Sequence, residues 1–273
     1  GHSGSDINLG RANANKVIAR FIWECSQSWD ITVCSFEGGN LRNAIPREAN
    51  AVFGIHSDHK EAMMHHLNKY AAEIRNEYSG VEPSMDLRIE EYDRPEFCMD
   101  SETSIALIRA IYSAPHGVYS MSRDIEGLVE TSTNLASVKL VGDDKVVVTT
   151  SQRSSVESRK NDMAGQVEAH FQLAGAEVTH SDGYPGWAPN MNSEIMKITA
   201  EAYDELFGKK PAIKAIHAGL ECGLFLAKYP NLDMVSFGPT MTGVHSPDEK
   251  LYIPTVEKFW QHLCRVLEKV SAL

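Results

Sequence analysis

Residues 215–249 read AIHAGLECGLFLAKYPNLDMVSFGPTMTGVHSPDE. Two glycine-rich turns in this stretch flank a short apolar run, which predicts a buried strand. The second turn presents His245 within GVHSP, between that strand and a helix that we expect to begin near residue 254. A neutral imidazole on such a turn is able to bind a metal ion. From these residues alone, an ordinary loop histidine is the more common interpretation.

The part of the chain before residue 184 combines amphipathic helices with strands of alternating or continuous apolar character. We expect helices at residues 8–27, 63–78, 101–113 and 155–174, and strands at residues 31–36, 50–56, 85–89, 129–141, 145–151 and 176–180. This order contains two copies of an αββαβ layout. It predicts a duplicated α+β domain, with helices on one face of a single antiparallel sheet.

A proline- and glycine-rich crossing, DGYPGWAP at residues 182–189, marks a domain boundary that we place between residues 183 and 184. Beyond it, the pattern predicts helices at residues 191–207 and from 254, and strands near 212–216 and 234–237. Short apolar strands that alternate with helices are typical of a mostly parallel, covered sheet. We therefore expect residues 184–273 to form the C-terminal part of an α/β domain.

The composition indicates a globular protein that binds neither nucleic acid nor membranes. The chain has 273 residues, 42% of them hydrophobic, and a net charge of -11. This charge would repel nucleic acid and anionic lipid, and no run approaches the roughly 18 to 20 apolar residues that span a bilayer. The five cysteines contain no CxxC pair, so we expect reduced thiols and a cytoplasmic location. They are Cys25, Cys34, Cys98, Cys222 and Cys264.

Four longer strings carry a resemblance that covers nearly the whole chain: GHSGSDINLGRANANK, GVYSMSRDIEGLVETSTNLASV, HAGLECGLF and DMVSFGPTMTGVHSPDE. They resemble the co-catalytic zinc peptidase family, in its branch of aminoacyl-histidine dipeptidases. The resemblance implies that residues 1–183 form a lid and dimerisation domain without its first elements. It also implies that residues 184–273 end the catalytic domain, and that a catalytic half precedes this chain in a longer protein.

The activity that this resemblance implies is hydrolysis of dipeptides such as Xaa-His by metal-activated water. The family uses two zinc ions, with manganese or cobalt as alternatives, and the histidine of its GVHSPDE loop is a ligand, which here is His245. The other ligands lie in the N-terminal half. We therefore expect the chain alone to hold no catalytic metal and to be inactive. The resemblance also implies a homodimer. A non-catalytic dimerisation or clamp module and a related tripeptidase, deacylase or carboxypeptidase are the alternatives.

Three residues of the first domain match substrate-binding positions of the family. His2 lies in a similar H-S-G setting and implies a donor to the scissile carbonyl oxygen; otherwise it is a frayed terminal residue. Asn43 and Arg153 imply contacts that hold the substrate. An arginine at a strand-to-helix turn offers a two-pronged donor for a C-terminal carboxylate, which suits an exopeptidase. The alternatives are a turn residue for Asn43 and a solvated cap for Arg153.

Glu221 is the candidate for the other end of the substrate. It lies in the GLECG turn, which borders the substrate pocket in the family, and its carboxylate could pair with a free α-amino group. A solvated glutamate in a glycine-rich loop is the alternative.

Overall fold

A computed structural model describes residues 1–142, 144–181, 183–187, 190–214, 217, 221–242 and 249–272. The chain divides into two compact units. Unit 1 consists of residues 1–186 and 216–218, and unit 2 consists of residues 187–215 and 219–273. The division between residues 186 and 187 falls within the proline- and glycine-rich crossing at residues 182–189, where the sequence predicted a boundary between residues 183 and 184.

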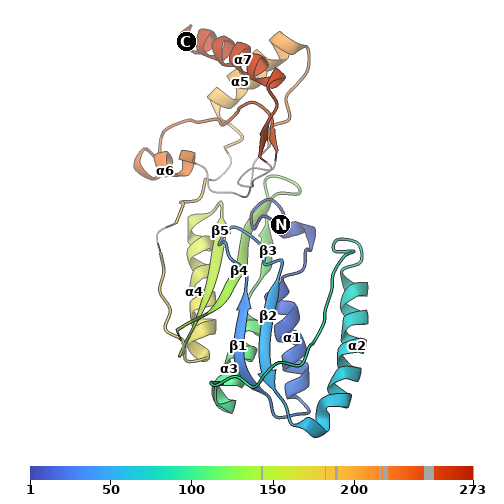
Figure 1. The fold of residues 1–273 in the computed structure, drawn as a ribbon. Coiled ribbons are helices and arrows are strands. Elements are labelled where there is room, and N and C mark those ends of the chain that lie inside the picture. The colour runs from blue at the N-terminus through green and yellow to red at the C-terminus, as the bar shows by residue number, and fades with distance from the viewer. Residues whose placement is uncertain are drawn as a thin grey trace. The chain divides into compact units, whose positions relative to one another are not determined.

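Unit 1 is built around an antiparallel sheet of five strands (Figure 1). The strands are β1 (Thr32–Gly38), β2 (Ala49–Gly54), β3 (Gly117–Met121), β4 (Val129–Val141) and β5 (Lys145–Ser154). Their order is β2-β1-β4-β3, and β5 pairs with β4. Thr131, Ser132 and Thr133 of β4 each pair with both β3 and β5, so these two strands lie on opposite edges of β4.

Four helices accompany this sheet, and Figure 1 shows α1, α3 and α4 along one side of it. They are α1 (Ala14–Ser26), α2 (Lys60–Glu77), α3 (Ser101–Ser113) and α4 (Glu157–Leu173), with two short 3-10 helices, η1 (Ile7–Leu9) and η2 (Ser57–His59). An antiparallel sheet with helices confirms the predicted α+β class of this part.

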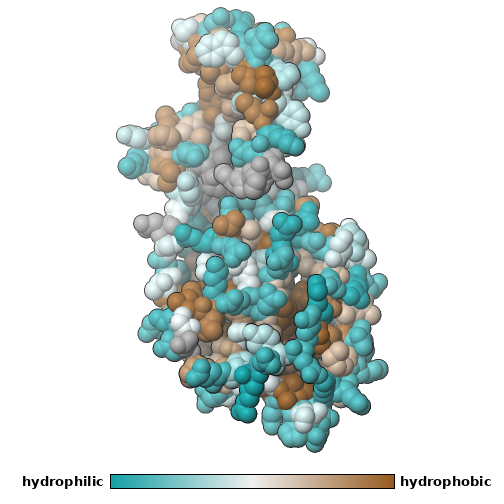
Figure 2. Space-filling view, viewed as in Figure 1, coloured by the Kyte–Doolittle hydropathy of each residue, from teal (hydrophilic) through white to brown (hydrophobic). Residues whose placement is uncertain are grey.

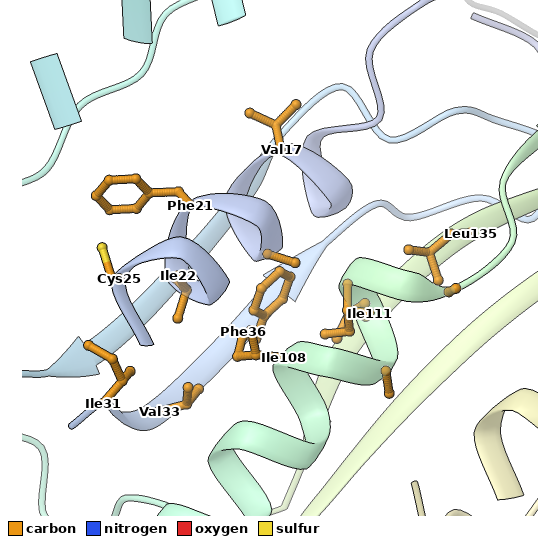
Figure 3. Close-up of a cluster of buried hydrophobic side chains, with 14 of the residues drawn as sticks. Val17, Phe21, Ile22, Cys25, Ile31, Val33, Phe36, Ile108, Ile111 and Leu135 are labelled. Atoms are coloured by element: carbon orange, nitrogen blue, oxygen red, sulfur yellow. The ribbon is translucent and has the colours of Figure 1, made fainter. Parts of the chain in front are cut away.

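One hydrophobic cluster joins the helices to the sheet (Figure 3). Phe36 of β1 is fully buried and lies between α1 and α3. Ile22 comes from α1, Ile108 from α3 and Leu135 from β4, and all three are fully buried as well. Because these side chains come from both halves of unit 1, the unit has one main core rather than one core for each predicted repeat.

The predicted αββαβ repeat is wrong in its last strand. Residues 85–89 and 176–180 form no strand in the structure, although Met85, Leu87 and Val178 pack against the main core. The alternating apolar residues therefore indicated correctly that one side of each segment is buried. They could not indicate whether a neighbouring strand is present to pair with the segment. The structure also contains β3, which the sequence did not predict. The described order is αββα followed by αβββα.

Helix α1 begins later than predicted, because the chain before it forms a separate turn. Residues Ile7–Leu9 form η1, which ends at Gly10 with a φ of 69°. Asn13 then caps α1, and its side chain accepts hydrogen bonds from the backbone N–H groups of Asn15 and Lys16. The amide group of Asn13 also donates to the Leu135 carbonyl at 2.9 Å. The cap thus ties the start of α1 to β4.

The structure contains a disulfide between Cys34 and Cys98, which are 64 residues apart. The expectation that all five cysteines are reduced is therefore wrong for this pair. The backbone N–H of Met99 donates to the Val33 carbonyl at 2.9 Å, and this bond brings Cys98 beside β1. No short cysteine spacing signals such a pairing, because the chain between the two residues passes through β2 and α2.

Unit 2 contains α5 (Glu194–Phe207), α6 (Glu221–Lys228), α7 (Pro254–Ser271), β6 (Met241–Thr242) and β7 (Lys250–Leu251). Its buried core consists of Ile198 and Ala202 of α5 and Val266 of α7. Arg265 and Lys269 of α7 form ion pairs with Glu205. The helices at 191–207 and from 254 are thus confirmed within a few residues, and α6 was not predicted.

The predicted parallel sheet is not found in the described part of unit 2. Residues 212–214 and 234–237 are not in strands, and the sheet present is the antiparallel pair β6-β7. The physical reason is that an apolar run becomes a strand only beside another strand, and these runs have no neighbour among the described residues. None of the described helices is long and apolar enough to cross a membrane.

Candidate functional site

The first turn of the chain fixes the ring of His2 in one orientation. Nδ1 of His2 accepts hydrogen bonds from the backbone N–H groups of Gly4 at 3.1 Å and Ser5 at 3.2 Å. The backbone N–H of His2 donates to Asp6 at 2.8 Å. Because Nδ1 acts as an acceptor, the proton of the neutral ring lies on Nε2, which is therefore a hydrogen-bond donor. His2 is not a frayed terminal residue in this structure.

The segment that contains Asn43 lies beside this turn. His2 forms a β-bridge with Ala44, and the backbone N–H of Ser3 donates to the Asn43 carbonyl at 2.8 Å. The side-chain amide of Asn134, on β4, donates to the carbonyl of Ala44 at 2.8 Å. The structure thus holds His2 and Asn43 together against one strand of the sheet.

Arg153 lies inside a strand rather than in the predicted strand-to-helix turn. Strand β5 continues to Ser154, since Ser154 pairs with Thr131 and their hydroxyl groups are 2.9 Å apart. Helix α4 begins only at Glu157, two residues later than predicted, and has no side-chain cap. The Ser154 hydroxyl instead accepts from the backbone N–H of Val156.

The guanidinium group of Arg153 is half-buried and has no carboxylate at ion-pair distance among the residues that the structure describes. Its Nε atom is buried without a hydrogen-bond partner in the same part of the chain. Burial lowers the pKa of Arg153 from its ordinary value, because removal from water disfavours the charged form. A buried cation without an anion is costly, so this geometry favours an anionic ligand. The solvated-cap alternative does not fit it.

His217 lies against the same part of β4 as Arg153, and the sequence did not indicate it. Nε2 of His217 is 2.7 Å from the hydroxyl oxygen of Ser132, and both residues are buried. Ser132 is the register partner of Arg153, so their side chains are neighbours across the two strands. Burial lowers the pKa of His217 to about 4, and the positive charge of Arg153 acts in the same direction. His217 is therefore neutral at pH 7.

These buried histidines predict a loss of stability in mild acid. Burial lowers the pKa of His116 to about 4, as it does for His217, and the charge of Lys16 adds to the effect on His116. An unfolded histidine takes up a proton near pH 6.5. Between pH 6.5 and about pH 4 the unfolded chain binds protons that the folded chain does not. The free energy of unfolding should therefore fall as the pH is lowered through this range.

Urea unfolding at a series of pH values will measure this slope. We expect His116→Gln to flatten it between pH 6.5 and about 4, because one of the two low-pKa histidines is then removed. The exposed His65 is the matched control, and His65→Gln should leave the slope unchanged. A slope that His116→Gln does not alter would contradict this interpretation.

The remaining predicted site residues lie elsewhere. Glu221 is the first residue of α6, in unit 2, and it is exposed; it begins a helix rather than lying in a turn. His245 lies outside the described residues. Among the residues that the structure describes, no group of three or more His, Cys, Asp or Glu side chains could hold a metal ion. Of the predicted residues, the structure therefore connects His2, Asn43 and Arg153 through β4.

Comparison with known proteins shows what this chain is similar to. The family model of a peptidase dimerisation domain matches residues 1–82. The crystal structure of aminoacylhistidine dipeptidase from Vibrio alginolyticus covers 98% of this chain with a TM-score of 0.88 and 41% sequence identity. The chain belongs to the family of this dipeptidase. The cytosol non-specific dipeptidase of Escherichia coli K12 is 38% identical over 272 residues, which is 100% of this chain.

The match covers only part of each relative. The chain spans 56% of the length of the Escherichia coli dipeptidase and 55% of the Vibrio alginolyticus structure. It thus corresponds to about half of a dipeptidase of this family, and the resemblance seen in the sequence strings is confirmed.

Proposed function

We propose that this chain is the C-terminal portion of a metal-dependent dipeptidase and that unit 1 binds the substrate. The single observation that carries the proposal is the half-buried guanidinium of Arg153, whose Nε atom is buried without a hydrogen-bond partner among the described residues. The names of the two relatives support dipeptides as the substrate class. The term completed enzyme is used below for this chain joined to a segment equivalent to the part of the relatives that it does not match.

Arg153 would recognise the C-terminal carboxylate of the dipeptide. A guanidinium group presents parallel N–H donors that match the two oxygens of a carboxylate. In unit 1 it is partly removed from water, which strengthens its attraction to an anion. An enzyme that requires a free carboxylate next to the scissile bond removes or releases single residues, which is the chemistry of a dipeptidase. Asn43 would add a further polar contact from the neighbouring segment.

His2 would donate a hydrogen bond through Nε2–H to the carbonyl oxygen of the scissile bond. The oxygen becomes more negative as water adds to the carbonyl carbon, so the donor stabilises the transition state more than the substrate. The two backbone donors on Nδ1 orient the ring for this role. Glu221 would pair with the free α-amino group at the other end of the dipeptide.

The metal ions would be held mainly by residues outside this chain, with His245 as the ligand that this chain contributes. A bound divalent metal lowers the pKa of water and so supplies a nucleophile near neutral pH. The described residues do not form such a site, and the roles given to His2 and Arg153 do not depend on which metal is used. Two zinc ions, or manganese or cobalt in their place, remain the family-based proposal.

Arg153→Ala in the completed enzyme should raise KM for a dipeptide about 10- to 150-fold with a smaller effect on kcat. This range corresponds to the loss of about 1.5–3 kcal/mol from a hydrogen bond to a charged group. Steady-state kinetics with a dipeptide and with its C-terminal amide will test the assignment. The amide lacks the carboxylate, so its KM should be nearly the same in the variant and the wild type.

Arg159→Ala is the matched control, because Arg159 already forms an ion pair with Glu130 at 3.2 Å. It should leave the preference for the free acid over the amide intact. Arg153→Lys should recover only part of the binding, since an ammonium group cannot form the two parallel bonds. Equal constants for wild type and Arg153→Ala would refute the clamp.

Unit 2 would be completed by the remaining half of the catalytic domain. Its described surface exposes large apolar side chains, some of them visible in Figure 2. They include Leu206, Phe225, Ile253, Trp260 and Leu267. Trp260 and Leu267, both on α7, are 62% and 59% exposed. Apolar surface of this extent is typical of an interface.

Co-expression of the chain with the missing half will test this part of the proposal. Sedimentation should show a complex of the two, and dipeptide turnover should appear only when both are present. The peptidase dimerisation domain at residues 1–82 supports a homodimer of that complex. If neither association nor turnover appears, a non-catalytic dimerisation module becomes the better assignment.

A cytoplasmic location is proposed from the name of the Escherichia coli relative. The Cys34–Cys98 disulfide is unusual for that compartment. Titration of free thiols in the purified protein without reductant will show whether five or three cysteines react.

A further inference from the structure

His217 occupies a position between the two proposed substrate-binding groups. Its ring contacts Ser132, the cross-strand partner of Arg153. Its backbone carbonyl packs against the turn that orients His2: a Cβ atom added to Gly4 would lie 2.3 Å from the His217 oxygen and 3.1 Å from Cε1 of His2. Only a glycine at position 4 allows this approach. One residue therefore contacts both the His2 turn and the Arg153 strand pair.

The hydrogen bond between Nε2 of His217 and the Ser132 hydroxyl, with 2.7 Å between the two atoms, ties the ring to β4. The ring cannot leave this position without the loss of that bond.

The place of His217 in the chain is unusual. It belongs to unit 1, whereas residues 190–214 and 221–242 belong to unit 2. The chain therefore returns from unit 2 to unit 1 to place this residue, and then continues with α6.

We propose that His217 is a positioning residue, which holds the Arg153 guanidinium and the His2 turn in a fixed relation on unit 1. The inference rests on the proposed function, since it assigns His217 to the same substrate face. With a fixed distance between the carboxylate clamp and the oxyanion donor, the face would accept a dipeptide and exclude longer peptides whose carboxylate lies further from the scissile bond.

The first test uses the 273-residue chain and the exchange of the Arg153 Nε–H proton with water, measured by NMR with arginine labelled with ¹⁵N. We expect His217→Phe and Ser132→Ala to raise this exchange rate about tenfold or more, the effect of one lost hydrogen bond. Ser132→Ala removes only the hydroxyl partner, so it serves as the second variant if His217→Phe does not fold.

His170→Gln is the matched control in unit 1, because Nε2 of His170 contacts the Ala110 carbonyl at 2.8 Å and not the substrate face. It should leave the exchange of Arg153 unchanged. An unchanged exchange rate in Ser132→Ala, with the fold intact, would overturn the positioning role. This measurement needs neither substrate nor metal.

The second test uses the completed enzyme and the ratio of kcat/KM for a dipeptide to that for its amide. His217→Phe should lower the ratio by about tenfold or more, and this loss should vanish in an Arg153→Ala background, because His217 would act on the carboxylate only through the position of Arg153. Equal losses in both backgrounds would overturn the inference. If Arg153→Ala itself leaves the ratio unchanged, the proposed clamp fails, while the exchange measurement still decides the role of His217.

Discussion

Replacing His2 with alanine in the completed enzyme should lower kcat for dipeptide hydrolysis about 100- to 1,000-fold and change KM little, as expected for a lost oxyanion donor. The donor is Nε2–H, since Nδ1 accepts from the backbone of Gly4 and Ser5. The loss of a contact that is strong only in the transition state lowers kcat and leaves KM nearly unchanged. Steady-state kinetics at saturating metal and substrate will measure both constants.

The His2 turn itself could be disturbed by the same substitution, so a variant that weakens only the turn is required. Asp6→Asn weakens the hydrogen bond from the His2 backbone to Asp6 but keeps the imidazole. We expect it to reduce kcat by less than tenfold, because the donor remains present. Similar losses of kcat in His2→Ala and Asp6→Asn would assign the effect to the turn and would remove His2 from the mechanism.

Phe36→Ala should reduce the free energy of unfolding of unit 1 by about 3–5 kcal/mol. Phe36 is fully buried between α1 and α3 (Figure 3), and the shortened side chain would leave a cavity that packed helices cannot close. Urea unfolding followed by tryptophan fluorescence will measure the change. In a Trp187→Phe, Trp260→Phe background the signal comes from Trp23 and Trp29, both of which pack against the main core.

Phe97 is the matched control, because it lies in the same unit and its residue is 63% exposed. Phe97→Ala should change the free energy of unfolding by no more than about 0.5 kcal/mol. A loss below about 1 kcal/mol for Phe36→Ala would show that the core does not depend on this side chain.

The sequence predicted best the helices and strands whose ends are marked by local residues such as caps, prolines and glycine turns. Helix α3 was expected at residues 101–113 and has these bounds. Asp100 caps its start by accepting from the Thr103 backbone N–H, and Pro115 follows its end. Strand β4 also has the predicted bounds, and a turn at Gly142 follows its end. Such signals are local, and a single sequence contains them in full.

Features that depend on distant partners could not be predicted in this way. The last residues of β5 are polar and read as a turn, but the pairing of Ser154 with Thr131 keeps Arg153 in the strand. His217 was overlooked because its partner, Ser132, is 85 residues away. The only available signal was its place in the HAGLECG string. The metal ligand His245 lies outside the described residues, so its assignment stays a prediction.

The disulfide between Cys34 and Cys98 closes a covalent ring that contains β2 and α2. While the ring is closed, β2 and α2 remain covalently linked to β1 even when their packing is lost. The unfolded chain therefore has fewer accessible conformations. Reduction opens the ring, and β2 and α2 are then held only by the β1–β2 pairing and by their packing in the main core. The oxidation state of one sulfur pair would thus set how tightly one flank of the sheet is bound.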